Sequence, residues 1–291
     1  MKNKISRRFY NDREVRAVWV EEKAEWFFSV PDVIGAIRKE DSYEKCRNYW
    51  KYLKGKFKKE GNELVSATTQ LKMTASDGKK YNTDALNADG IMRLAAEFPA
   101  KVGSEFISWF TRSADTVDEK SKQKAYLLFD STFAERIEVG TTKGLQQIHS
   151  FLFGGLYDFA GKIRQCNIGK GGFTFASVDY LATTLYGIDL MPEDTLENIV
   201  KKYVEMNVAH PFMEGNGRST RIWLDLILKK NLSVCVDWSK INKNDYLLAM
   251  RNSPYDDGMI QRLIAEAITT ETDNREVFMK GIDYSYYYEE V

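Results

Sequence analysis

Up to residue 113, the pattern of apolar and polar positions predicts a mixture of short strands and helices. β-Branched and aromatic residues are concentrated at 15–20 and 26–30, which predicts a hairpin. A second strand pair is expected at 70–74 and 81–83, joined by a Ser-Asp-Gly turn. This part is therefore expected to form a compact α/β domain. Its expected helices span 32–38, 42–54, 84–97 (capped by Asp84) and 102–110.

From residue 125 onward, apolar residues at helical spacing dominate, and two segments depart from this pattern. Residues 167–176 are rich in glycine, with aromatic residues at alternate positions, which predicts a short β-hairpin. A plain surface turn is the alternative. The last residues, 281–291, show no core periodicity, which is typical of a frayed terminus. The expected helices span 125–138, 143–159, 177–187, 195–209, 218–230, 243–252 and 257–270.

The stretch from Ser113 to Lys124 is polar and charged, with few apolar residues. This composition is typical of a linker, or of an exposed helix that crosses between domains. The sequence therefore predicts an α/β domain at 1–113, a linker at 114–124 and a helical domain at 125–291. The predicted fold class is mainly α with a smaller N-terminal α/β domain.

Composition restricts the classes of function. The chain has 42 basic and 42 acidic residues, so no global charge favours a polyanionic partner. Cys46, Cys166 and Cys235 are widely spaced and form neither a disulfide framework nor a metal motif, which fits a reducing compartment. The charged N-terminus lacks the apolar region of a signal peptide, and no apolar run is as long as a membrane span. We expect a cytoplasmic protein with no membrane partner.

One short stretch combines residues suited to binding phosphate. Gly215, Asn216 and Gly217 can adopt backbone conformations that turn successive N–H groups toward an anion. A helix beginning near Arg218 would add its unpaired N–H groups and the positive end of its dipole. Arg218 and Arg221 are three residues apart, so both lie on one face of the first turn. Their forked guanidinium groups could hold further phosphate oxygens.

Two residues just before this turn could supply the chemistry. Glu214 is a hard-cation ligand that could hold Mg²⁺ against bound phosphates. His210, one of two histidines in the chain, could act as a general base on a hydroxyl. Each feature also has a structural interpretation: a histidine at a helix end, an interhelical turn and a solvated arginine face. The combination in this order is more specific than any one part.

Residues 210–221 resemble, without a gap, the Fic family signature H-P-F-x-(D/E)-G-N-G-R-x-x-R, and residues 148–164 resemble the segment that precedes it. Fic proteins transfer AMP from Mg·ATP to a Ser, Thr or Tyr hydroxyl of a target protein. The resemblance implies that His210 deprotonates this hydroxyl and Glu214 holds Mg²⁺. It also implies that residues 215–217 cradle the α-phosphate.

By the same resemblance, Arg218 and Arg221 would hold the β- and γ-phosphates. The related Doc-type kinases carry Lys at the position of Gly217, so this chain falls on the AMP-transfer side.

The hairpin at 167–176 lies where Fic proteins carry a flap that clamps a target segment by main-chain pairing. The resemblance therefore implies a target-docking role for its tip, which consists of Lys170, Gly171, Gly172 and Phe173.

The C-terminus offers an alternative to fraying. Ser285-x-x-x-Glu289 resembles the autoinhibitory motif (S/T)-x-x-x-E-(G/N) of Fic proteins, with Glu290 where Gly or Asn is usual. The resemblance implies that Glu289 occupies the place of the γ-phosphate on Arg221 through a bidentate ion pair. The tyrosines beside Glu289 could accept AMP from an uninhibited enzyme that modifies itself.

The N-terminal part leaves its partner open. Residues 49–59 interleave basic and aromatic side chains, which suits nucleic-acid binding or a lysine-rich solvated helix whose aromatics face the core. This part resembles the N-terminal domain of viral BRO proteins and phage antirepressors, a family linked to DNA binding. Two functions follow: an autoinhibited AMP-transferase, or a nucleotide-sensing DNA-binding regulator. The target protein is unknown, and a homo-oligomer stays open. The resemblance to the N-terminal domain of BRO proteins and antirepressors rests on Trp19, residues 26–34, 71–73 and 77–79, Asp84, and residues 106–109.

Overall fold

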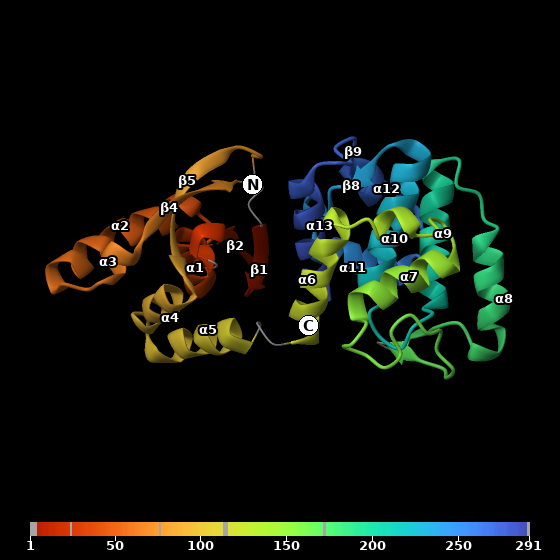
Figure 1. The fold of residues 1–291 in the computed structure, drawn as a ribbon, viewed down its shortest axis with the longest axis horizontal. Coiled ribbons are helices and arrows are strands. Elements are labelled where there is room, and N and C mark those ends of the chain that lie inside the picture. The colour runs from red at the N-terminus through yellow and green to blue at the C-terminus, as the bar shows by residue number, and fades with distance from the viewer. Residues whose placement is uncertain (1–4, 24, 76, 113–115, 171–172, 290–291) are drawn as a thin grey trace. The chain divides into compact units, whose positions relative to one another are not determined.

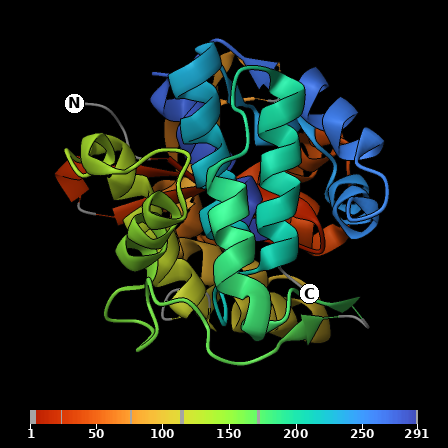
Figure 2. The same cartoon turned by 90° about the vertical axis from the view of Figure 1, so that its right-hand side faces the viewer.

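The computed structural model separates the chain into two compact units, Met1–Asp115 and Thr116–Val291. Figure 1 shows the fold of the two units as a ribbon, and Figure 2 shows the same ribbon turned by 90° about the vertical axis. The structure describes residues 5–23, 25–75, 77–112, 116–170 and 173–289.

The N-terminal unit contains a five-stranded antiparallel sheet in the order β1-β2-β3-β5-β4. Both strand pairs expected from the sequence are present, as β2–β3 and β4–β5. Strand β1 was not predicted, because its two central arginines interrupt the apolar pattern. The strands are β1 (Ile5–Tyr10), β2 (Arg13–Val20), β3 (Glu25–Ser29), β4 (Thr69–Thr74) and β5 (Lys80–Asn87).

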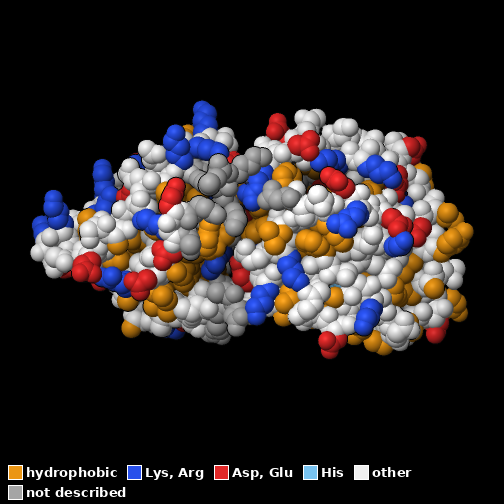
Figure 3. All heavy atoms as spheres, in the orientation of Figure 1, with side chains coloured by type: hydrophobic (Ala, Val, Ile, Leu, Met, Phe, Trp, Pro, Cys, Tyr) orange, Lys and Arg blue, Asp and Glu red, His pale blue; other side chains and the backbone are white. Residues whose placement is uncertain are grey.

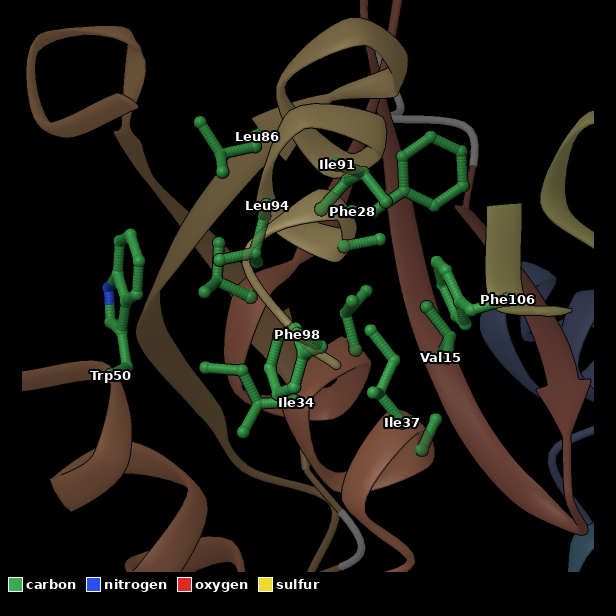
Figure 4. Packing of buried hydrophobic residues seen from close by; sticks show 14 of the residues in the cluster. Val15, Phe28, Ile34, Ile37, Trp50, Leu86, Ile91, Leu94, Phe98 and Phe106 are labelled. Atoms are coloured by element: carbon green, nitrogen blue, oxygen red, sulfur yellow. The ribbon is translucent and has the colours of Figure 1, made fainter. Parts of the chain in front are cut away.

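Helices complete the core of this unit. In Figure 4, Val15 and Phe28 of the sheet lie near Ile34 of α1 and Phe106 of α5, and all four side chains are buried. The helices and the 3-10 turn are η1 (Glu21–Lys23), α1 (Val30–Arg38), α2 (Tyr43–Glu60), α3 (Leu64–Ala67), α4 (Ala88–Ala96) and α5 (Ala100–Arg112).

The predicted helix at 84–97 begins later than expected. Strand β5 continues to Asn87, whose side chain accepts a hydrogen bond from the N–H of Gly90 and so caps α4. Asp84 therefore does not cap the helix. Its carboxylate instead accepts hydrogen bonds from Trp50 Nε1 at 2.8 Å and Lys54 Nζ at 2.6 Å. These contacts with residues distant in the sequence hold Asp84 in strand β5.

Helix α2 carries the basic and aromatic residues that suggested nucleic-acid binding. Trp50 and Phe57 are buried in the core, whereas Tyr52 is 65% exposed. On the face shown in Figure 3, basic and acidic side chains of this unit are interspersed. The core therefore uses two of the aromatic rings that stacking on bases would need.

The C-terminal unit is a helical bundle organised around α10 (Asn216–Leu232), which packs against α7, α9 and α13. Figure 2 looks onto this unit with α8 and α9 side by side in front. The prediction of a mainly helical chain with a smaller α/β part is confirmed. The other helices and 3-10 turns are α6 (Val117–Asp130), η2 (Ala134–Arg136), α7 (Thr142–Phe153), α8 (Val178–Asp189), α9 (Leu196–Ala209), η3 (Trp238–Lys240), α11 (Lys243–Asn252), α12 (Gly258–Ala267) and α13 (Arg275–Tyr287).

Two short antiparallel pairs accompany the helices of this unit. In the described part of the chain, none of the helices is both long and apolar enough to span a membrane. The strands are β6 (Gly169–Lys170) with β7 (Phe173–Thr174), and β8 (Cys235–Val236) with β9 (Ile268–Thr269).

Polar pairs join α6 to α13. Residues 117–124, expected as a linker or an exposed helix, form the first half of α6, where Ser121 and Lys122 are buried. Lys122 Nζ lies 3.0 Å from Asp283 Oδ1 in α13, and Tyr286 donates a hydrogen bond to Ser121 Oγ. Of the two interpretations of the C-terminus, fraying is wrong for residues 281–287, because α13 is anchored by groups that an apolar pattern does not reveal.

Candidate active site

The loop from His210 to Gly215 joins α9 to α10. His210 ends α9 in the left-handed region (φ 48°), and its N–H donates to the carbonyl of Met206. Gly215, also left-handed (φ 79°), begins α10. Asn216 closes the loop, since its side chain accepts from the N–H of Phe212 at 2.8 Å and donates to the carbonyl of the same residue at 2.7 Å. The side chain of Asn216 thus holds the loop in shape.

The first turn of α10 offers an anion site. No side chain caps the helix at Gly215, so its first N–H groups are not taken by a cap. The carboxylate of Glu289 lies against this turn, because a Cβ on Gly217 would come within 2.2 Å of Glu289 Oε1. A carboxylate at a helix N-terminus is favoured by the dipole, as a phosphate would be. Glu289 therefore occupies the position where the sequence predicts phosphate.

All three guanidinium nitrogens of Arg221 donate hydrogen bonds, to Ser285 in α13, to Glu289 just after it and to Tyr246 in α11. Its Nη2 lies 2.6 Å from Glu289 Oε1 and also donates to the carbonyl of Ser285, while Nε donates to Ser285 Oγ at 2.7 Å. Nη1 donates to the Tyr246 hydroxyl at 3.0 Å. The ion pair was expected to be bidentate, but a single nitrogen contacts Glu289, because Ser285 and Tyr246 hold the other two. Burial alone would lower the pKa of Arg221, but Tyr246 and Glu289 raise it above its ordinary value.

Arg218 is held by two carboxylates. Nη1 pairs with Asp118 in the first turn of α6, and Nη2 lies 3.0 Å from Glu214 Oε1. The guanidinium also lies 5.0 Å from the ring centroid of Phe153. Its Nε is buried and has no hydrogen-bond partner among the described residues. The sequence did not reveal Asp118, because the pair spans 100 positions of the chain.

Glu214 remains accessible at the loop. Its side chain is 58% exposed, and Oε1 accepts from the N–H of Gly215 at 2.9 Å. Its carboxylate is therefore open to solvent beside the start of α10. Across the described residues, no cluster of three or more His, Cys, Asp or Glu side chains could hold a metal ion.

His210 is oriented on two sides. Its ring stacks on Phe175 with centroids 3.7 Å apart and an interplanar angle of 11°. Nδ1 lies 3.1 Å from the carbonyl of Asn207. Since a carbonyl only accepts, Nδ1 must carry the proton, and in the neutral ring the lone pair is on Nε2. The arrangement prepares Nε2 as a base.

The predicted hairpin is present as β6 and β7, in which Lys170 pairs with Phe173. Phe173 contacts Phe175, the residue that stacks on His210, with centroids 5.4 Å apart. The hairpin therefore connects directly to the candidate base. The two glycines of its predicted tip, Gly171 and Gly172, lie outside the described residues, as does Glu290.

Two residues of the segment preceding the hairpin received no role from the sequence. His149 Nδ1 accepts from the N–H of Gly161, so Nε2 carries the proton and donates to the carbonyl of Glu214 at 2.9 Å. Its ring stacks on Phe212 at 3.8 Å, and burial lowers its pKa to about 4. His149 is thus a neutral, buried residue that supports the loop from His210 to Gly215 through its hydrogen bond to Glu214. Arg164, also buried, binds the end of α9.

The profile of the Fic/DOC family matches residues 140–228. "Probable protein adenylyltransferase y4lH" of Sinorhizobium fredii is 30% identical over 142 residues, which cover 44% of this chain and 73% of that protein. This chain belongs to the Fic/DOC family. "Protein adenylyltransferase VbhT" of Bartonella schoenbuchensis is 31% identical over 147 residues, or 46% of this chain. The chain spans only 30% of the length of VbhT.

A solved Fic domain has a lower similarity. The N-terminal Fic domain of a Bartonella effector protein (Bartonella sp. AR 15-3) has a TM-score of 0.48 and 19% identity, covering 56% of this chain and 84% of that one. The family match lies within the C-terminal unit and contains His210, Glu214, Arg218 and Arg221.

Proposed function

We propose that this Fic protein transfers AMP from ATP to a Ser, Thr or Tyr hydroxyl of a target protein. The observation that carries the proposal is one loop that holds His210, with a lone pair on Nε2, beside the uncapped start of α10 and its two arginines. The relatives named protein adenylyltransferase support the same activity.

The chemistry follows from these positions. Nε2 of His210 accepts the proton of the target hydroxyl, and the hydroxyl oxygen forms a bond to the α-phosphorus. The bond from the α-phosphorus to the β-bridging oxygen breaks, and pyrophosphate leaves. The N–H groups at 215–217 hold the α-phosphate, while Arg218 and Arg221 hold the β- and γ-phosphates. Charge that develops on the phosphate oxygens is stabilised by groups already in place.

Glu214 would hold Mg²⁺ at this site. An exposed carboxylate beside a phosphate site fits the ion, which is typically bound by one or two carboxylates plus phosphate oxygens and water. The ion supplies neutralisation of phosphate charge.

Autoinhibition by α13 is part of the proposal. Glu289 competes with the γ-phosphate for Arg221 Nη2, and its carboxylate lies over Gly217 at the anion site. With Glu289 in place, ATP would bind with its α-phosphate misaligned for attack. A displacement of about an ångström can cost on the order of a hundredfold in rate.

The tyrosines near Glu289 differ in their capacity to accept AMP. The hydroxyls of Tyr286 and Tyr288 are buried and hydrogen-bonded, so they serve packing. Tyr284 and Tyr287 are only partly buried and remain candidates for self-labelling.

We further propose that the hairpin at β6–β7 docks the target by main-chain pairing. Nucleic-acid binding by the N-terminal unit stays a prediction. Its test is a shift assay with the full chain at low and high salt, because phosphate contacts weaken steeply as salt rises. Absence of a shift at low salt would contradict it.

The position of the label in ATP tests the reaction. The protein is incubated with Mg²⁺, cell lysate and ATP labelled on either the α- or the γ-phosphate. Relative to lysate alone, we expect additional label on protein from α-labelled ATP only, and none with His210→Ala. That variant should still bind ATP, because binding rests on α10 and its arginines. Label from γ-labelled ATP above that of lysate alone, or wild-type labelling by His210→Ala, would contradict the mechanism.

A further inference from the structure

Arg164 lies where three segments of the Fic domain meet. The residue is 2% exposed, and among the described residues its guanidinium donates hydrogen bonds only to backbone carbonyls. Nε donates to His210 at 2.8 Å, Nη1 to Cys166 at 2.7 Å, and Nη2 to both Ala209 and Ala176. One buried side chain therefore connects the end of α9 to both sides of the hairpin.

The end of α9 needs such a partner. The last carbonyls of a helix lack intrahelical donors and carry the negative end of its dipole. Arg164 satisfies the carbonyls of Ala209 and His210 through its side chain, and that of Pro211 through its own N–H at 2.9 Å. His210 has a left-handed backbone, which an L-residue keeps only where its surroundings hold it. Arg164 supplies much of that hold.

The same guanidinium fixes the base of the hairpin. Cys166 precedes β6 and Ala176 follows β7, and the carbonyls of both accept from Arg164. Phe175, next to Ala176, stacks on the His210 ring. The N–H of Ala176 also donates to the carbonyl of Val208 in α9. Arg164 thus fixes the position of the hairpin relative to the imidazole of His210.

We propose that Arg164 is a positioning residue for AMP transfer, which locks the backbone of His210 and the base of the hairpin into one unit. The hydroxyl of a target segment docked on the hairpin is then held at a fixed position relative to Nε2 of His210. This inference rests on the proposed function, and it adds the residue that couples target docking to the catalytic base.

The two histidines of the chain make the proposal testable by NMR without ATP. The Phe175 ring shifts the His210 ring protons, and the Phe212 ring does the same for His149, so each imidazole reports its own stack. His210→Ala assigns the signals. Arg164→Lys keeps the charge but cannot reach four carbonyls. We expect the His210 signals of this variant to move toward solvent-exposed values while the His149 signals stay unchanged.

Activity provides the second measurement. Arg164→Lys should lower the rate of transfer on the order of a hundredfold with little change in ATP affinity, because α10 is untouched. Lys162→Ala, an exposed change two residues away, is the matched control and should behave as wild type. Because the NMR result needs no transfer, failure of the proposed function is distinguishable from failure of this inference.

Two outcomes would overturn the inference. One is an Arg164→Lys variant whose His210 signals and transfer rate both match wild type. The other concerns Phe175→Leu, which removes the stack and leaves the guanidinium in place. It provides the test if Arg164→Lys fails to fold, which loss of the His149 signals as well would show. A wild-type rate in Phe175→Leu would remove the coupling of hairpin and base, whereas a large drop supports it.

Discussion

Replacing Glu289 by Gln removes the charge that holds Arg221 while keeping the size of the side chain. The carboxylate lies 2.6 Å from Nη2 and is 26% exposed, so solvent screens it in part. A hydrogen bond between charged groups contributes about 1.5–3 kcal/mol, and the exposure favours the lower end. About 1.4 kcal/mol corresponds to a tenfold change in an equilibrium. We therefore expect transfer to rise about tenfold.

The fold should survive this change. Arg221 keeps its bonds to Ser285 and Tyr246, and the buried pair of Lys122 with Asp283 still anchors α13. The assay measures initial rates with α-labelled ATP and a lysate that contains the target. Glu276→Gln, which removes the same charge from the opposite end of α13, is the matched control.

Equal rates for the wild type and Glu289→Gln, with the target present, would refute the reasoning. A similar rise in Glu276→Gln would assign the effect to net charge instead of the contact with Arg221. ATP affinity, measured by calorimetry, should change far less than the rate, because Glu289 competes only for the outer phosphate.

Three further predictions concern single residues. Arg221→Ala should not activate transfer, because it removes the phosphate contact along with the contact to Glu289; a labelling rate above that of the wild type would contradict this. Tyr288→Phe should raise transfer several-fold, since its buried hydroxyl, which lies 2.6 Å from the carbonyl of Trp238 and 2.9 Å from that of Ile241, anchors the residue next to Glu289. The carbonyl of Trp238 keeps the N–H of Ile241, whereas that of Ile241 loses this donor, at a cost of about 1–3 kcal/mol; an unchanged rate would contradict the prediction. Because burial lowers the pKa of His149 from 6.5 to about 4, the unfolded chain binds its proton more readily than the native protein. Stability should therefore be full above about pH 6.5 and fall by about 3 kcal/mol as pH drops to about 4, which urea unfolding at several pH values can check.

The sequence predicted most where the relevant residues are close together in the chain. The loop from His210 to Arg221 lies within a single helix-turn-helix, so motif and spacing were enough to identify it. The mainly helical fold and the family membership were also predicted from patterns that are local in the sequence, and both predictions are confirmed. The roles of the site residues stay predictions until they are tested by substitution.

The misses involve partners distant in sequence. The apolar pattern left a frayed terminus as one interpretation of the C-terminal residues, because the buried face of α13 carries Asp283 and Tyr286, whose partners Lys122 and Ser121 lie in α6. Asp84 was taken as a cap, although Trp50 and Lys54 hold it in the sheet. Whether a polar residue is buried depends on such partners, and the periodicity of apolar residues does not indicate where those partners are.

The position of Glu289 at the end of α13 makes the inhibitor a tethered ligand. Its local concentration at Arg221 is set by the fold and does not change when the protein is diluted. A free peptide spanning 275–289, added to a chain truncated before α13, would have to reach roughly millimolar concentration to act as strongly. The γ-phosphate of ATP therefore competes for Arg221 with a fixed internal concentration of the Glu289 carboxylate. Agents that detach α13 would control the enzyme more effectively than any change in the amount of protein.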